Sequence, residues 1–219
     1  MRSAVRAAIA TGMAALLAFS GAMTAHASTV AEPGPAPTLA GTETLQEGDV
    51  IAWSPVLGAD DWVELGQAET PAAGSTAETE AQPLATMTRA AVSCGSSTSV
   101  LEKYSSKYDG TIKLECGSAG GFGLKHILSS HPEQQWRNQM GGPGNVQDFI
   151  KYLIRGGLSA PSKKGNVSAS NKRCYSTPTM IYEMVNGKPK YKKTINASIF
   201  VSVNNKRVVT AIPSTTSRC

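Results

Sequence analysis

Acidic and basic residues are segregated along this chain of 219 residues, and the segregation limits where a folded domain can form. Residues 28–90 carry ten acidic side chains and one basic side chain, and they are rich in Ala, Pro, Thr, Glu and Gly. Such a composition buries too little apolar surface to offset chain entropy, so we expect a largely disordered pro-segment or linker. Residues 91–219 carry eighteen Lys and Arg against six acidic residues, a net charge of +12. We therefore expect one basic folded domain over 91–219.

One stretch of the acidic segment is apolar, with VIAWSPVL at 50–57 and WVEL at 62–65. These residues are expected to dock on another surface. The whole segment 28–90 then has two interpretations. It can cover the basic domain and mimic a polyanion until it is removed, or it can be a solvated spacer.

The first 27 residues have the pattern of a secretory signal peptide. Arg2 and Arg6 give a basic start, the run from Ala7 to Met23 is apolar, and Ala25-His26-Ala27 fits the cleavage motif. No later segment approaches the roughly 20 apolar residues that a membrane helix needs. We therefore expect a secreted, extracellular protein without a membrane anchor.

Four cysteines lie in the basic domain, at Cys94, Cys116, Cys174 and Cys219. An even number of cysteines in a small secreted domain predicts two disulfides, although four cysteines allow three pairings. We favour Cys94–Cys116 with Cys174–Cys219. The cysteines are too far apart in sequence to resemble a zinc-ligand cluster, and we expect neither a metal nor another cofactor.

Local patterns predict helices in the first half of the basic domain. A short helix is expected at 97–105, a strand at 111–116, a glycine-rich turn at 117–123 and a second short helix at 124–130. The second helix should end at His131, because Pro132 disfavours helical geometry in the residue before it. A longer helix should begin after the N-cap Asn145 and stop at Gly156-Gly157. Its apolar stripe consists of Val146, Phe149, Ile150, Leu153 and Ile154.

The second half of the basic domain is predicted to form β-structure. After a mobile basic loop at 160–173, strands are expected at 179–185, 190–203 and 207–212, with Asn186-Gly187 as a hairpin turn. The expected fold is α+β, with N-terminal helices packed on a C-terminal antiparallel β-meander.

The segment Gly120–Pro132, GGFGLKHILSSHP, holds both histidines that follow the signal peptide. Histidine exchanges protons near neutral pH, and Lys125 adds a cation beside His126, so the segment suggests acid–base chemistry on a phosphate. The alternative is that both histidines are structural. A step of five residues puts His126 and His131 on different faces of an ideal helix, which argues against a helical metal site.

GFGLKHILSSHP followed by a helix, together with a basic β-region ending in RVVTAIP, resembles the barnase–EndoU–colicin–RelE superfamily of ribonucleases. The similarity covers Cys94 to Thr216 and is greatest to the bacterial toxin and phage-encoded branches. It implies a metal-independent endoribonuclease. His126 and His131 match the two histidines of the superfamily, and Thr210 matches its Ser/Thr on the last strand. Lys125 is a candidate phosphate ligand by proximity to His126.

The expected reaction is transesterification, in which one imidazole deprotonates the ribose 2′-OH and the other protonates the leaving 5′-oxygen. Basic residues of the β-region would attract the RNA backbone. Alternatively, they are solvated charges that keep an exposed sheet edge from pairing with another chain. These residues are Lys188, Lys190, Lys192, Lys193, Lys206 and Arg207. Tyr182 and Tyr191 either stack on bases or pack on the sheet.

Two other classes of protein stay open at this point. The first is a secreted, disulfide-bonded binding or inhibitor protein that has no enzymatic activity. The second is a metal-dependent DNase or phosphodiesterase, which the six acidic residues of the basic domain disfavour. A ribonuclease that is lethal to the producing cell would need either export before folding or a separate immunity or inhibitor protein.

Overall fold

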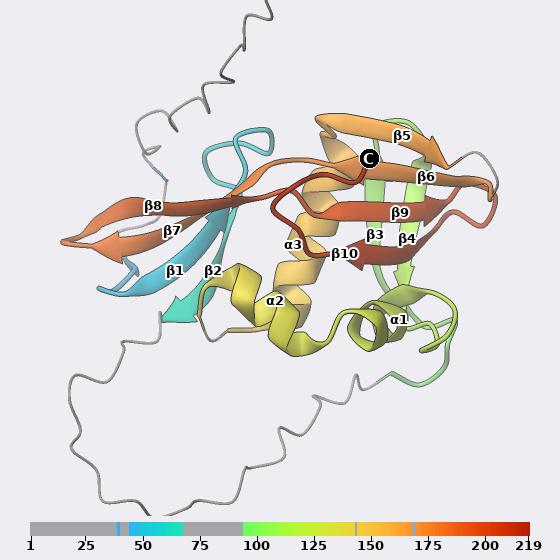
Figure 1. Cartoon of the computed structure of the whole chain (residues 1–219), viewed down its shortest axis with the longest axis horizontal. Coiled ribbons are helices and arrows are strands. Elements are labelled where there is room, and N and C mark those ends of the chain that lie inside the picture. Colours follow the sequence, from blue (N-terminus) through green and yellow to red (C-terminus); the bar gives the residue numbers. More distant parts are fainter. Residues whose placement is uncertain (1–38, 40–43, 68–93, 143, 168–169) are drawn as a thin grey trace, which may run out of the picture. The chain divides into compact units, whose positions relative to one another are not determined.

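The computed structural model describes residues 39, 44–67, 94–142, 144–167 and 170–219 (Figure 1). The predicted signal peptide and most of segment 28–90 lie outside the described residues.

Three helices and ten strands form in the described part of the chain. The helices are α1 (Gly123–Ser130), α2 (Glu133–Met140) and α3 (Val146–Ser159). The first four strands are β1 (Asp49–Trp53), β2 (Trp62–Gln67), β3 (Val100–Ser106) and β4 (Gly110–Glu115). The other six are β5 (Lys163–Val167), β6 (Lys172–Ser176), β7 (Thr179–Val185), β8 (Lys188–Ile195), β9 (Ser198–Ser202) and β10 (Arg207–Ile212). The fold is α+β and rich in strands.

The strands form two sheets, ordered β2-β1-β7-β8 and β3-β4-β10-β9-β6-β5. Every pairing is antiparallel except that of β10 with β4. The strands of the expected meander are therefore divided, since β7 and β8 belong to the smaller sheet and β9 and β10 to the larger one. The predicted long strand 190–203 is interrupted at Asn196 and Ala197, where the chain passes from one sheet to the other.

The apolar stretch of the acidic segment is part of the fold. Strand β1 pairs with β2 on one side and with β7 on the other. Val50, Ala52 and Leu65 are buried in the same core cluster as the helices. Residues 44–67 therefore cannot be removed as a cover without opening the core. The hypothesis that the acidic segment covers the basic domain then applies only to its other residues, all of which except Leu39 lie outside the described residues.

Helix α3 begins as predicted, because the Asn145 side chain accepts hydrogen bonds from the backbone N–H groups of Gln147 (3.0 Å) and Asp148 (3.3 Å). The prediction that it ends at Gly156-Gly157 is wrong, and the helix continues to Ser159. A Cβ on Gly157 would lie 3.0 Å from the Ile199 side chain. These glycines let α3 approach the sheet closely.

Two other local predictions are also wrong. Residues 97–105 were expected to be helical, but 100–106 form β3, in which buried Tyr104 alternates with exposed Lys103 and Ser105. The predicted loop 160–173 contains β5 and the start of β6, because β6 pairs with both β5 and β9. In both places strand pairing decides the conformation, because β3 forms a hairpin with the adjacent β4, and β6 pairs with the adjacent β5 and with the more distant β9.

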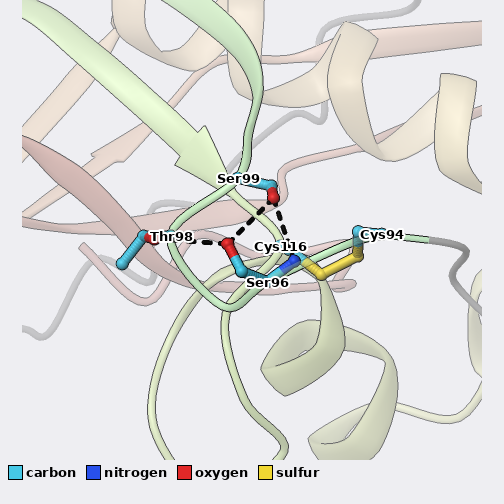
Figure 2. The surroundings of a disulfide bond; sticks show 5 residues. All are labelled: Cys94, Ser96, Thr98, Ser99 and Cys116. Atoms are coloured by element: carbon cyan, nitrogen blue, oxygen red, sulfur yellow. Dashed lines mark hydrogen bonds between the residues drawn. A yellow bond between two sulfur atoms is a disulfide. The ribbon is translucent and has the colours of Figure 1, made fainter.

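Both predicted disulfides form. Cys94 bonds to Cys116, with Cα atoms 6.1 Å apart, and Cys174 bonds to Cys219, with Cα atoms 5.4 Å apart. Figure 2 shows the first bridge beside a turn in which the Ser99 hydroxyl accepts a hydrogen bond from the Ser96 N–H (3.0 Å). The second bridge ties the C-terminus to β6.

The burial of Leu65 predicts that the 44–67 segment contributes to stability. Leu65 is 1% exposed, so Leu65→Ala should lower the free energy of unfolding by about 2–5 kcal/mol. Val56→Ala is the matched control, because Val56 is 42% exposed and its truncation should change stability by no more than about 0.5 kcal/mol. Urea unfolding followed by tryptophan fluorescence measures both. Equal, small effects would show that this segment is not part of the core.

Candidate functional site

The glycine-rich turn before α1 closes back on itself. The Ser118 N–H donates to the Phe122 carbonyl (3.0 Å), and Gly117 has a φ of +71°. A Cβ on Gly117 would lie 1.5 Å from the Phe122 carbonyl oxygen, so this close approach requires glycine. The turn places the start of α1 directly beside the end of β4.

Helix α1 ends where Pro132 predicts. His131 has extended backbone angles (φ −129°, ψ 92°), and its N–H donates to the Ile127 carbonyl (2.9 Å). His126 lies within the helix and His131 on the chain as it leaves the helix. The two histidines can therefore approach each other without sharing a helix face.

The imidazole of His126 is held by the turn that precedes it. Its Nδ1 lies 2.8 Å from the Ala119 carbonyl oxygen, and the Ser130 hydroxyl lies 3.5 Å from the same nitrogen. A carbonyl oxygen only accepts hydrogen bonds, so Nδ1 carries the proton in this contact. Nε2 is then the nitrogen left to exchange a proton with a substrate.

Burial, followed by the positive charge of Arg218 and that of His126, lowers the pKa of His131, whereas a hydrogen bond that its ring donates to the Gln135 side chain raises this pKa. These interactions place the two imidazoles and the Arg218 guanidinium in one region of the molecule. Arg218 reaches this region because its backbone N–H donates to the Ser198 hydroxyl (2.8 Å) and the adjacent Cys219 is bonded to β6. Arg218 is not among the site residues predicted from the sequence. The predicted pairing of Cys219 was the one signal that pointed to the C-terminus.

Strand β10 lies against α1 (Figure 1). It carries Thr210 opposite Phe200, just after an irregularity in its register with β9. The Thr210 hydroxyl oxygen is buried and has no hydrogen-bond partner in the described part of the protein. Lys125 is half-buried, and its backbone N–H donates to the Cys116 carbonyl (2.9 Å). The structure therefore brings the elements that carry His126, His131, Thr210 and Lys125 together.

The predicted RNA-binding cations fall into two groups. Lys188, Lys190, Lys192 and Lys193 lie on β8, at the edge of the smaller sheet. Lys192 pairs with Glu183 (3.1 Å), and Lys193 donates to the Asn138 carbonyl (2.5 Å). Burial and neighbouring Lys192 lower the pKa of Lys193.

The other two predicted cations, Lys206 and Arg207, lie at the start of β10 in the larger sheet. The Arg207 guanidinium lies 3.6 Å from the centre of the Phe122 ring and 3.4 Å from the Glu115 carboxylate. It therefore lies beside the turn that leads into α1. The chain does not bring its predicted RNA-binding cations into one cluster.

The aromatic side chains considered for base stacking pack on the smaller sheet instead. Tyr182 is buried, and its ring meets that of Tyr191 edge to face, with centroids 6.0 Å apart. The Tyr191 hydroxyl lies 3.0 Å from the Thr194 hydroxyl. Both tyrosines have structural contacts.

A cavity of about 310 Å³ is lined by residues that include Leu128, Arg137 and Asn145 and by none of the predicted site residues. No group of three His, Cys, Asp or Glu residues in the described ranges is arranged to hold a metal ion. None of the helices described is long and apolar enough to span a membrane.

No protein-family model, curated protein or solved structure matches this chain. The interpretation of the site therefore depends on its own residues and geometry.

The environment of His131 predicts a measurable titration. Its pKa should lie below the ordinary value of about 6.5, and Arg218→Gln should raise it by removing a nearby positive charge. Two-dimensional NMR of the histidine rings between pH 4 and 9 measures both values. Lys151→Gln removes a charge on α3 that makes an ion pair with Asp148, and it should leave His131 unchanged. A His131 pKa at or above 6.5 in the unsubstituted protein would contradict the described environment.

Proposed function

We propose that this protein is a secreted, metal-independent endoribonuclease that cleaves RNA by transesterification to a 2′,3′-cyclic phosphate. The observation that carries the proposal is the position of His131. It leaves α1 within electrostatic range of His126 and Arg218, while α1 packs against the strand that carries Thr210. Two imidazoles, a cation and a buried hydroxyl in one region are the groups that this reaction uses.

The two histidines take different roles in the proposed reaction. The lowered pKa of His131 keeps its imidazole neutral near pH 7, so it accepts the proton of the ribose 2′-OH. His126, with Nδ1–H held by the Ala119 carbonyl, acts in its protonated form and donates from Nε2. Its target is the 5′-oxygen of the departing nucleotide.

The bonds and protons of this step balance. The 2′-oxygen forms a bond to phosphorus while the bond from phosphorus to the 5′-oxygen breaks. One proton passes to His131 and one leaves His126, so the products are a 2′,3′-cyclic phosphate and a 5′-hydroxyl. Arg218 or Lys125 stabilises the negative charge on the non-bridging oxygens, and the Thr210 hydroxyl donates to one of them.

The two disulfides fit the proposed secretion, because such bonds persist in oxidising compartments. An active ribonuclease endangers the cell that makes it. We therefore also propose a separate inhibitor protein that covers the histidine site before export.

Replacement of either histidine tests the proposal. His126→Ala and His131→Ala should each lower the rate of RNA cleavage by about 10²–10⁴-fold, because each removes one proton transfer. Ser129→Ala, between them on α1, is the control and should retain the full rate. The assay follows a fluorescent RNA oligonucleotide with the full chain, recovered after export by its own leader. Circular dichroism verifies folding.

Three results of that assay would contradict the proposal. RNA left intact by the folded wild-type protein would favour a binding or inhibitor protein. Full activity in both histidine variants would show that neither histidine is catalytic. Loss of cleavage on adding EDTA would favour a metal-dependent nuclease.

A modified leaving group tests the assignment of acid and base. In an RNA whose scissile 5′-oxygen is replaced by sulfur, the leaving thiolate needs little protonation, since thiols have a pKa near 8.5. On this substrate His126→Ala should lower the cleavage rate by less than about tenfold, whereas His131→Ala should still lower it by about 10²–10⁴-fold. Single-turnover rates on both substrates provide the measurement. Rescue of His131→Ala in place of His126→Ala would reverse the assignment.

A further inference from the structure

One line of side chains crosses all six strands of the larger sheet. The register places Lys103 opposite Lys113 and Lys113 opposite Arg207, across β3, β4 and β10. It continues through Ser202 on β9 and Lys172 on β6 to Val167 on β5. Residues directly opposite each other in a sheet lie on the same face. We call Lys103, Lys113, Arg207, Ser202, Lys172 and Val167 the cationic row.

The cationic row lies on the face turned away from the core helix α3. Ile112 and Leu114, on either side of Lys113, are fully buried, as is Val208 beside Arg207. Because side chains alternate along a strand, the row residues point the other way. Gly157 of α3 packs on Ile199, whose register also places it on the opposite face from Ser202.

Four of the six row positions are cations. Neighbouring strands are about 4.8 Å apart, so the row spans roughly 24 Å. Like charges directly opposite each other destabilise a sheet, and Lys103, Lys113 and Arg207 occupy three adjacent strands. Within the described part of the chain, the row forms one ion pair, between Arg207 and Glu115. The row therefore presents a largely uncompensated line of positive charge.

The cationic row runs beside the histidine site. Arg207 packs on Phe122, the residue before α1, which fixes its guanidinium next to the turn that holds His126. Thr210 lies opposite Phe200, two residues along β9 from Ser202 and therefore on the same face. Ser202 and Phe200 are about 7 Å apart along β9.

We propose that the cationic row holds the phosphate backbone of a single-stranded nucleic acid and leads it to the histidine site. The proposal rests on the proposed function for the destination of the strand, but not for binding itself. A straight row across a sheet suits an extended single strand. Phe122 and Phe200 beside it offer aromatic rings on which bases can stack, and this favours a nucleic acid.

This assignment changes which cations bind the substrate. Arg207 was expected from the sequence, and Lys206 precedes it at the exposed turn. Lys103, Lys113 and Lys172 are added by the register of the larger sheet. The β8 lysines belong to the other sheet and are not part of the row.

Binding is measured with a fluorescein-labelled DNA oligonucleotide of twelve nucleotides, which lacks the 2′-OH and cannot undergo transesterification. Lys103→Gln with Lys113→Gln should weaken its binding to the full chain about tenfold. The slope of log affinity against log salt concentration should become shallower by about 1.4, the change expected for two lost contacts to a single strand. The melting temperature should not fall, because a repulsion is removed.

The matched control is Lys151→Gln with Lys164→Gln, which removes the same charge from α3 and from the opposite face of the sheet. It should retain wild-type affinity. Equal losses in the two variants, or no loss in the row variant, would overturn the proposal. So would tighter binding of heparin than of the oligonucleotide by the wild-type protein, or no binding of the oligonucleotide.

Parallel assays of RNA cleavage separate this proposal from the proposed function. A row-dependent affinity for DNA without RNA cleavage would support the row and refute the ribonuclease. RNA cleavage together with an affinity for DNA that does not depend on the row would support the ribonuclease and refute the row.

Discussion

The pairing of β10 with both β4 and β9 is the constraint on which the rest of the structure depends. It joins the β3–β4 hairpin to β9, β6 and β5, and so makes one sheet from segments separated by three helices. Val208 and Ala211 bury one face of β10 in the core, while α1 packs against the strand. The same strand carries Arg207 and Thr210. Its position therefore determines both the histidine site and the cationic row.

Features set by short sequence signals could be predicted from the sequence, whereas those that depend on strand pairing or on packing between elements could not. The Asn145 cap and the end of α1 before Pro132 depend on local geometry, and both formed as expected. The disulfide pairing is the favoured one of the three that four cysteines allow. Residues 97–105 were expected to be helical, whereas 100–106 form a strand that pairs with β4. The glycines at 156 and 157 looked like a helix stop, yet they serve a close approach to the sheet.

The candidate site shows the same division. The histidines and Lys125 were identified because they lie within one short motif. Arg218 was missed because its place beside His131 depends on the C-terminal tail, which Ser198 and the Cys174–Cys219 bridge hold in position. The members of the cationic row come from strands far apart in the chain. Composition predicted that the domain is basic, but only the register shows that its cations form a line.

The central claim is that RNA itself supplies the nucleophile, and the fate of solvent oxygen tests this most directly. RNA is cleaved in water enriched in ¹⁸O, and the first products are analysed by mass spectrometry and ³¹P NMR. The account predicts 2′,3′-cyclic phosphate ends, 5′-hydroxyl ends and no ¹⁸O in the initial product. A linear phosphate that contains ¹⁸O in the first product would mean direct hydrolysis by water, and it would contradict the account.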